Sequence, residues 1–243
     1  MGKEKLIVAL DVDSLDKALA LVDKLAPHVG MFKVGMELFN AEGPQAVRAI
    51  RERGGKVFLD LKMHDIPTTV AKAARVLTRH GASIINLHAG GGLAMMQAAA
   101  QAVEEEAGAL GIECPLVIAV TVLTSMDQSA MNNQLNIPGT VEEQVVHWAK
   151  LAQQAGLQGV VASPLEIESI RAACGHDFSI VTPGIRPAGV KKDDQHRIMT
   201  PAKAIERGAS YLVVGRPITA ADNPVDAARS IVEEITRVSG GVK

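Results

Sequence analysis

Short hydrophobic segments alternate with segments of helical pattern along the whole chain. The hydrophobic segments are rich in Val, Ile and Leu, as is typical of parallel strands that are covered on their outer face. The segments between them have the mixed polar and hydrophobic pattern of surface helices. The predicted strands are 6–12, 31–36, 56–62, 83–89, 115–123, 159–163, 178–184 and 211–218. The predicted helices are 15–25, 44–53, 69–80, 93–107, 141–155, 165–173, 200–207 and 225–238.

Eight strand-then-helix units in 243 residues predict a closed, parallel (β/α)8 barrel of the α/β class. A doubly wound open sheet is the competing architecture. It usually has fewer strands, and the first turn, DVDSLD at 11–16, lacks the glycine fingerprint of nucleotide-binding open sheets. No linker rich in Pro, Gly or Ser divides the chain, so we expect residues 1–243 to form one domain.

Two predicted connections are unusually long, at 125–140 and 185–199. Long polar connections in a compact domain are often functional lids. Both follow strands, which places them at the carboxyl end of the barrel, where active sites of this fold lie.

Composition narrows the classes of function. Hydrophobic residues make up 47% of the chain and the net charge is −2, so nothing points to a nucleic-acid or membrane surface. The two cysteines, Cys114 and Cys174, lack the spacing of a metal site and are expected to be reduced thiols. The first residues form neither a signal peptide nor a membrane span, so we expect a cytoplasmic protein.

Candidate chemistry begins on the strand 56–62. Alternation along a strand sends Leu59 and Leu61 to one face and Asp60 and Lys62 to the other. Asp60 and Lys62 then point into the barrel at its mouth, and Asp65 follows on the next loop. Buried charges are costly unless they are matched, so an inward pair needs a reason. The alternatives are a catalytic pair and an internal salt bridge that only fills space.

Two other strands carry a charge on the same inward side. Asp11 lies near the end of the first strand and Lys33 lies on the second. Together with Asp60, Lys62 and Asp65 they form an alternating array of acids and bases. Such an array can keep a lysine protonated and aim its proton at a substrate carbon.

The last two strands predict an anion site. They end in turns that combine glycine with arginine, and Gly215 and Arg216 offer backbone N–H groups and a guanidinium. The loops after the seventh and eighth strands are the usual phosphate site of this fold. Ordinary turn glycines beside solvated arginines are the alternative. Asn86 and His88 also alternate inward on the fourth strand, either as site residues or as core polar groups with satisfied hydrogen bonds.

These residues resemble the orotidine 5′-phosphate decarboxylase family, in its bacterial form, over nearly the whole chain. The most specific segment is DLKMHDIPTT at 60–69, which matches the family's Asp-x-Lys-x-x-Asp-Ile-Pro signature. Further segments fit in the same order: LDVD, FKVG, VTVLTS, TPGIRP and VVGRPIT. The resemblance implies decarboxylation of orotidine 5′-phosphate to uridine 5′-phosphate, without a metal or other cofactor.

The resemblance also implies individual roles at one end of the site. Lys62 would donate the proton to C6 of the pyrimidine, with Asp60 beside the departing carboxylate. Lys33 would bridge Asp60 and the ribose, and Asp11 would hold ribose hydroxyls. Such an arrangement suits a reaction that leaves an electron pair in an sp² orbital, since an ammonium group stabilises that charge electrostatically.

Other residues would bind the remainder of the nucleotide. Thr124 would contact the pyrimidine, while Arg186, Gln195, Gly215 and Arg216 would hold the phosphate under the 185–199 loop. Asp65, Ile66 and Thr69 belong to the implied substrate-binding set, and the equivalents of Asp65 and Thr69 serve the neighbouring subunit. A homodimer with shared sites is therefore expected.

A Mg²⁺-dependent phosphosugar decarboxylase or aldolase of the same barrel group is the nearest alternative. Those enzymes resemble the chain in the Asp-x-Lys-x-x-Asp motif but carry an acidic metal ligand where this sequence has Lys33. A lysine there argues against a metal, because a cation would repel it. A catalytically inactive barrel that senses phosphate ligands is a more distant alternative.

Overall fold

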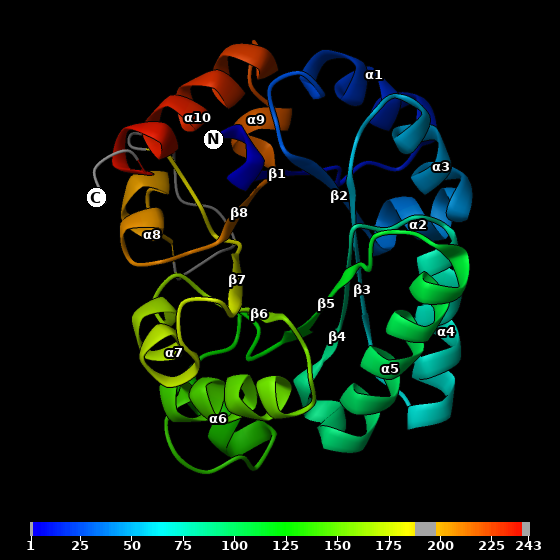
Figure 1. Ribbon diagram of the computed structural model, residues 1–243. Helices are drawn as coiled ribbons and strands as arrows, with labels where there is room; N and C mark the ends of the chain where they lie inside the picture. Colours follow the sequence, from blue (N-terminus) through cyan, green and yellow to red (C-terminus); the bar gives the residue numbers. More distant parts are fainter. Residues whose placement is uncertain (1, 188–197, 240–243) are drawn as a thin grey trace.

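The computed structural model describes residues 2–187 and 198–239. Eight parallel strands pair in chain order, and β8 also pairs with β1, so the sheet closes into a barrel (Figure 1). The predicted (β/α)8 barrel is thereby confirmed. The strands are β1 Leu6–Ala9, β2 Met31–Gly35, β3 Val57–Met63, β4 Ile84–His88, β5 Leu116–Val120, β6 Gly159–Val161, β7 Ser179–Thr182 and β8 Tyr211–Val214.

Helices surround the barrel on its outside (Figure 1). None of the helices in the described part of the chain is long and apolar enough to cross a membrane. The α-helices are α1 Leu15–Leu25, α2 Met36–Glu42, α3 Pro44–Glu52, α4 Pro67–Arg79, α5 Gly92–Leu110, α6 Val141–Gln154, α7 Ile167–Cys174, α8 Pro201–Glu206, α9 Arg216–Thr219 and α10 Pro224–Ser239. Shorter helical turns are η1 Lys3–Lys5, η2 Ala89–Gly91 and the π-helical η3 Ala130–Gln134.

The strands separate two hydrophobic clusters, because successive side chains of a strand point to opposite faces. On β3, Phe58 belongs to the cluster inside the barrel, and Val57 and Leu59 belong to the larger cluster between the sheet and the helices. The alternation predicted for this strand is therefore confirmed. The inner cluster consists of Ile7, Ala9, Met31, Phe58, Ile84, Ile118, Val181 and Val213.

The structure corrects the ends of several predicted elements. The strand predicted at 211–218 ends at Val214, and Arg216–Thr219 form the helix α9. Pro217 accounts for the change, since proline lacks the N–H that a central strand needs and suits the first turn of a helix. The strand predicted at 115–123 ends at Val120. The helix α2 was not predicted, because its seven residues are too few for a clear period.

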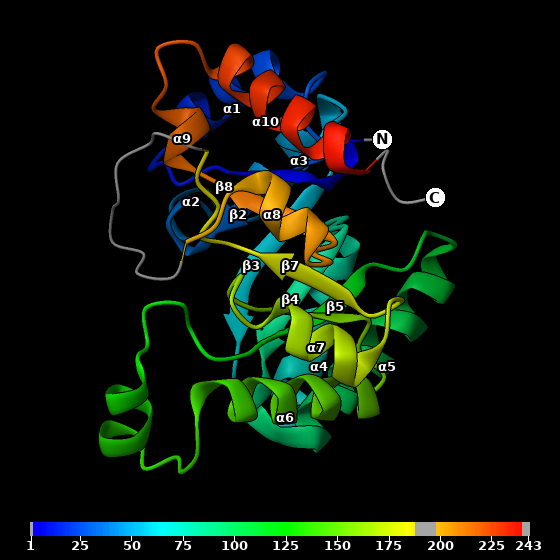
Figure 2. The same ribbon diagram turned by 90° about the vertical axis from the view of Figure 1, so that its left-hand side faces the viewer.

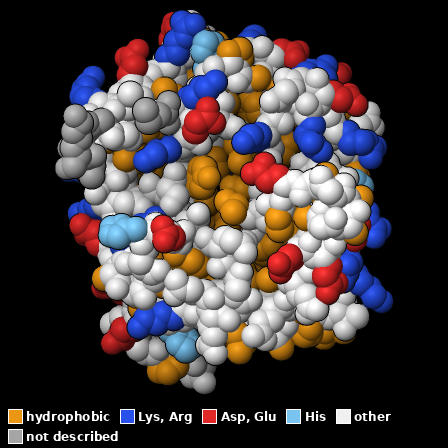
Figure 3. All heavy atoms as spheres, in the orientation of Figure 1, with side chains coloured by type: hydrophobic (Ala, Val, Ile, Leu, Met, Phe, Trp, Pro, Cys, Tyr) orange, Lys and Arg blue, Asp and Glu red, His pale blue; other side chains and the backbone are white. Residues whose placement is uncertain are grey.

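The two ends of the barrel differ in what they carry. The connection between β5 and α6 and the helix α9 after β8 project from the same end (Figure 2). That end is the carboxyl end of the strands, where this fold places its active sites. The opposite end has a hollow of about 330 Å³, lined among others by Met31, Ile84 and Tyr211. Figure 3 shows this opposite face, with hydrophobic side chains at its centre and charged side chains around them.

Candidate active site

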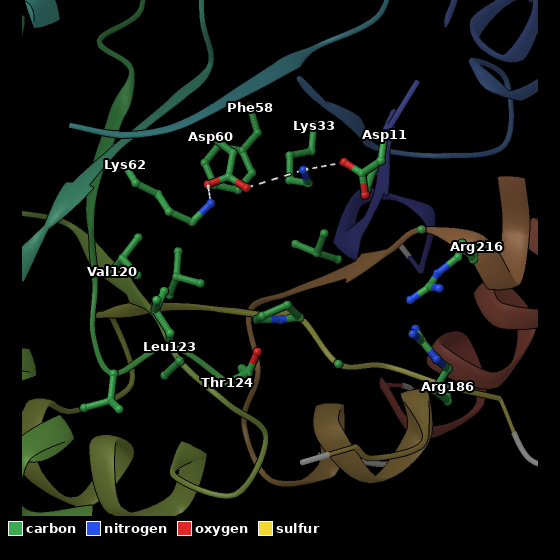
Figure 4. A pocket seen from close by; sticks show the side chains of 18 residues that line it. Asp11, Lys33, Phe58, Asp60, Lys62, Val120, Leu123, Thr124, Arg186 and Arg216 are labelled. Atoms are coloured by element: carbon green, nitrogen blue, oxygen red, sulfur yellow. Dashed lines mark hydrogen bonds and ion pairs between the residues drawn. The ribbon is translucent and has the colours of Figure 1, made fainter. Parts of the chain in front are cut away.

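A cavity of about 280 Å³ opens at the carboxyl ends of the strands. Eight of the predicted site residues line it, and they come from both ends of the sequence. Hydrophobic side chains, including Phe58, Val120 and Leu123, line the space between the charged groups (Figure 4). The predicted residues that line the cavity are Asp11, Lys33, Asp60, Lys62, Thr124, Arg216 and Gly215, and Arg186 completes the set.

Four of the five members of the predicted array form a continuous chain of ion pairs, and Asp65 is not among them (Figure 4). The ammonium Nζ of Lys62 lies 2.7 Å from Oδ1 of Asp60. On the other side, Nζ of Lys33 lies 3.4 Å from Oδ2 of Asp60 and 3.0 Å from Oδ1 of Asp11. Each lysine thus contacts a different oxygen of the Asp60 carboxylate. The arrangement holds the ammonium groups of β2 and β3 in place with one carboxylate from β3 and one from the segment after β1.

Asp60 is the central acid of this array, and its side chain is only 13% exposed. Burial favours the neutral acid, but the positive charges of Lys33 and Lys62 outweigh burial and hold the pKa of Asp60 below its ordinary value. Asp60 is therefore ionised at neutral pH. A carboxylate in this position attracts a proton-carrying Lys62 and orients it toward the cavity.

Gly35 provides the room for one of these cations. A Cβ atom at this position would lie 2.9 Å from Nζ of Lys33, closer than real Cβ atoms approach other atoms. Any side chain here would displace the ammonium group from its two carboxylates. The glycine in the FKVG segment, at the end of β2, is therefore part of the site although it carries no functional group.

Two arginines lie at the end of the cavity away from Lys62 (Figure 4). Arg186 is buried and donates from Nη1 to the carbonyl oxygen of Ile185 at 3.1 Å. Arg216 is exposed and begins α9, directly after Gly215. Their guanidinium groups face each other across this end of the cavity (Figure 4). Two fixed cations with the N–H groups at the start of α9 can bind a doubly charged anion such as a phosphate group.

Another group of predicted site residues lies outside the cavity. Asp65, Ile66 and Thr69 are exposed, within an uninterrupted exposed run at 64–69. Asp65 accepts a hydrogen bond from the backbone N–H of Ile66 at 2.6 Å, and Ile66 is 66% exposed. Within a single chain, these three residues do not line the cavity that contains Lys62. Gln195, predicted to hold the phosphate, lies outside the described residues, as does most of the 185–199 loop.

Asn86 has a role that the sequence left open. It is completely buried on β4 and bonds two parts of the array at once. Its Nδ2 donates to Oδ1 of Asp60 at 2.6 Å, and its Oδ1 accepts from the backbone N–H of Lys62 at 2.8 Å. Alternation along β4 indicated that Asn86 points inward. The sequence did not show its hydrogen-bond partners, because they lie on the neighbouring strand β3.

His88, two residues further along β4, lies beside the array. Its ring stacks on that of His64 at a centroid distance of 5.4 Å, and its edge meets Trp148. Burial lowers the pKa of His88, and the nearby His64 and Lys62 lower it further, so the ring is neutral at neutral pH. His88 accepts a hydrogen bond from the backbone N–H of Gly90. It is therefore a satisfied polar group at the edge of the site.

The donor set of the array does not suit a metal ion. Among the described residues, no cluster of three or more His, Cys, Asp or Glu side chains could hold one. The space between the carboxylates of Asp11 and Asp60 is occupied by the ammonium group of Lys33. An ammonium group there would repel a divalent cation, and the two carboxylates already form ion pairs with it.

Comparisons with known proteins agree with this geometry. Residues 4–231 match the model of a family described as "Orotidine 5'-phosphate decarboxylase / HUMPS family". The chain is 61% identical over 237 residues to the orotidine 5′-phosphate decarboxylase of Moorella thermoacetica, covering 98% of this chain and 94% of that protein. It is 54% identical to the enzyme of that name from Syntrophomonas wolfei, covering 96% and 98%. The crystal structure of orotidine 5′-phosphate decarboxylase from Lactobacillus acidophilus superposes with a TM-score of 0.85 at 41% identity, covering 95% and 98%.

Proposed function

Since the chain belongs to the orotidine 5′-phosphate decarboxylase / HUMPS family, we propose that it converts orotidine 5′-phosphate to uridine 5′-phosphate and CO₂, with Lys62 as the proton donor. The chain is a carboxy-lyase of pyrimidine biosynthesis, and this reaction is the last step in making uridine 5′-phosphate. The observation that carries the proposal is the Lys62 ammonium group, paired with Asp60 at 2.7 Å inside the cavity.

The proposed chemistry centres on Lys62. The bond between C6 and the carboxyl carbon breaks, CO₂ leaves, and the bonding electron pair remains on C6. The pyrimidine ring has no position that delocalises this pair well, so the charge must be stabilised electrostatically. The Lys62 ammonium group supplies a positive charge and then transfers its proton to C6.

The remaining residues of the ion-pair chain hold Lys62 in place. Asp60 holds the ammonium group through Oδ1, and in this proposal it would lie beside the departing carboxylate of the substrate. Lys33 pairs with Asp60 from the other side and with Asp11, and we propose that Asp11 and Lys33 bind ribose hydroxyls. The ion-paired part of the array thus alternates two carboxyl groups with two amino groups.

The arginine end of the cavity would bind the 5′-phosphate. Arg186 and Arg216, with the N–H groups at Gly215 and Arg216, would supply positive charge and donors, and Thr124, which lines the same cavity, would contact the pyrimidine. We propose that Gln195 and the 185–199 loop close over the phosphate. Binding energy from this remote group can then drive loop closure and assembly of the reacting end.

We further propose a homodimer with shared sites. Asp65, Ile66 and Thr69 lie on an exposed segment at the start of α4, outside the cavity of their own chain. Ile66 is 66% exposed, and packing it against a partner subunit would remove its apolar surface from water. In a dimer this segment would complete the cavity of the partner subunit. A small nucleotide is the only ligand that this proposal requires, and we place the protein in the cytoplasm.

The nearest alternative, a Mg²⁺-dependent phosphosugar enzyme, predicts a different response to chelation. We expect purified enzyme to convert orotidine 5′-phosphate to uridine 5′-phosphate at the same rate before and after exhaustive treatment with EDTA. The rate is measured as the loss of the ultraviolet absorbance of orotidine 5′-phosphate. Activity that disappears with EDTA and returns with Mg²⁺ would overturn the proposal, as would turnover of a phosphosugar in place of the nucleotide.

A further inference from the structure

The backbone of Lys62 is in a conformation that side chains rarely adopt. Its φ angle is +53°, in the left-handed region that favours glycine. The pairing of β3 with β4 is irregular at the same place: Leu59 pairs with Ile85 and Met63 pairs with Leu87. Four steps along β3 thus match two steps along β4, so Lys62 lies on a bulge. Bulges beside active sites re-aim a side chain.

Asn86 holds this bulge in place. The backbone N–H of Lys62 donates to Oδ1 of Asn86 at 2.8 Å, where a regular ladder would offer a backbone carbonyl. A left-handed backbone at a lysine costs free energy and persists only where surrounding contacts enforce it. Asn86 makes such a contact from β4, with a side chain that is completely buried.

The same side chain also fixes the carboxylate that pairs with Lys62. Nδ2 of Asn86 donates to Oδ1 of Asp60 at 2.6 Å, and this oxygen also receives Nζ of Lys62 at 2.7 Å. The contacts therefore form a ring that begins at the backbone of Lys62 and returns to its ammonium group. A backbone N–H only donates and a carboxylate only accepts, so an amide of this length is the side chain that serves both.

We propose that Asn86 is a positioning residue that aims the Lys62 ammonium group by holding both the Lys62 backbone and the Asp60 carboxylate. The role rests on the proposed function, because it concerns the proton donor of that reaction. Asn86 does not line the cavity, and the arginines lie at the far end, so its loss affects the chemical step more than nucleotide binding.

Two variants and a matched control test this role. Asn86→Ala removes both bonds, and Asn86→Asp keeps the shape but replaces the donor with an acid. The control is Gln158→Ala, because the Gln158 side chain also accepts from a strand N–H, that of Val117, and donates to a carbonyl, that of Gly156. Gln158 precedes β6, at the amino end of the barrel. For all three we would measure kcat and KM from pH 5 to 9, with circular dichroism melting to verify folding.

We expect Asn86→Ala to lower kcat by about 100-fold, with KM changed less than threefold, because a misplaced proton donor slows only the chemical step. Gln158→Ala should keep kcat within about twofold of wild type. In Asn86→Asp, a neutral carboxyl can still donate to Asp60, but its ionised form repels Asp60. The ratio of its kcat to that of wild type should therefore fall as pH rises, while the ratio for Asn86→Ala stays flat.

Three charged groups lie near position 86: Asp60 and Lys62 on β3, and Lys33 on β2, which pairs with Asp60. On β4 itself the titratable neighbour is His88. On β5, the residue that pairs with position 86 is the uncharged Ile118. These groups are common to wild type and variant, so the ratio isolates the new carboxyl. An active wild type with unchanged kcat in Asn86→Ala, or a flat ratio in Asn86→Asp, overturns the role. If Asn86→Ala does not fold, the pH profile of Asn86→Asp decides. An inactive wild type overturns the proposed function and this role with it.

Discussion

The two ends of the barrel both have a hollow rimmed by charges, but only one end has charges inside it. The hollows are similar in size, about 280 Å³ at the carboxyl end and about 330 Å³ at the amino end. At the carboxyl end, Lys33, Asp60 and Lys62 occupy inward strand positions and pair with one another. At the amino end the inward positions are apolar, as at Met31 and Ile84. The size of a hollow therefore does not identify the site.

The two lysines at the ends of β3 show the same difference between the ends of the barrel. Lys56 directly precedes β3 and is exposed beside the amino-end hollow, whereas Lys62 lies near the end of β3 beside Asp60. Lys56 has no carboxylate partner among the described residues, and Lys62 has one at 2.7 Å. Of the two lysines at the ends of β3, only Lys62 is therefore held in a defined direction by a carboxylate. Charge that is matched inside the barrel is the feature that distinguishes the active end.

The largest expected effect comes from removing the lysine at each end of β3. Lys62→Ala should lower kcat by at least about 10⁴-fold, because it removes the proposed proton donor and the positive charge proposed to stabilise C6. Lys56→Ala should stay within about twofold of wild type, as substitutions of exposed residues usually do. Both are measured by single-turnover and steady-state decarboxylation. Equal losses in the two variants would contradict the assignment of the active end.

The arginines allow a second comparison between the ends. Arg216→Ala should lower kcat/KM for orotidine 5′-phosphate by about 10- to 100-fold, the usual effect of losing a hydrogen bond to a charged group. Arg51→Ala, beside the amino-end hollow, should have no effect.

The substrate provides the control for this prediction. With orotidine, which lacks the phosphate, wild type and Arg216→Ala should react at the same low rate, because the arginine has nothing to bind. A loss of equal size with orotidine would mean that Arg216 acts on the reacting end or on the fold, and would remove the phosphate assignment.

The sequence predicts the parts of this site that depend on local pattern. Alternation along β3 places Asp60 and Lys62 inward because its period is a property of the strand itself. The bulge at Lys62 and the bonds of Asn86 could not be predicted, since they depend on how β4 pairs with β3, 24 residues away in the sequence. The predicted strand extends beyond the observed end of β8 because hydrophobic residues continue through Ile218. Pro217 is the residue that marks the change from strand to helix.

The smallest expected effect concerns whether the active end is complete within one chain. Asp60 and Lys62 meet inside the chain, while Asp65, on the same connection, is exposed outside the cavity. If Asp65 serves a second copy, Asp65→Ala and Lys62→Ala homodimers should each be nearly inactive. Mixed in equal amounts with subunit exchange, they should recover to about a quarter of wild-type activity, because half the dimers are hybrids with one intact site each. Exchange is verified by native mass spectrometry of differently tagged subunits. If verified hybrid dimers do not recover activity, Asp65 does not serve the partner subunit. The active end of the barrel would then be complete within one subunit.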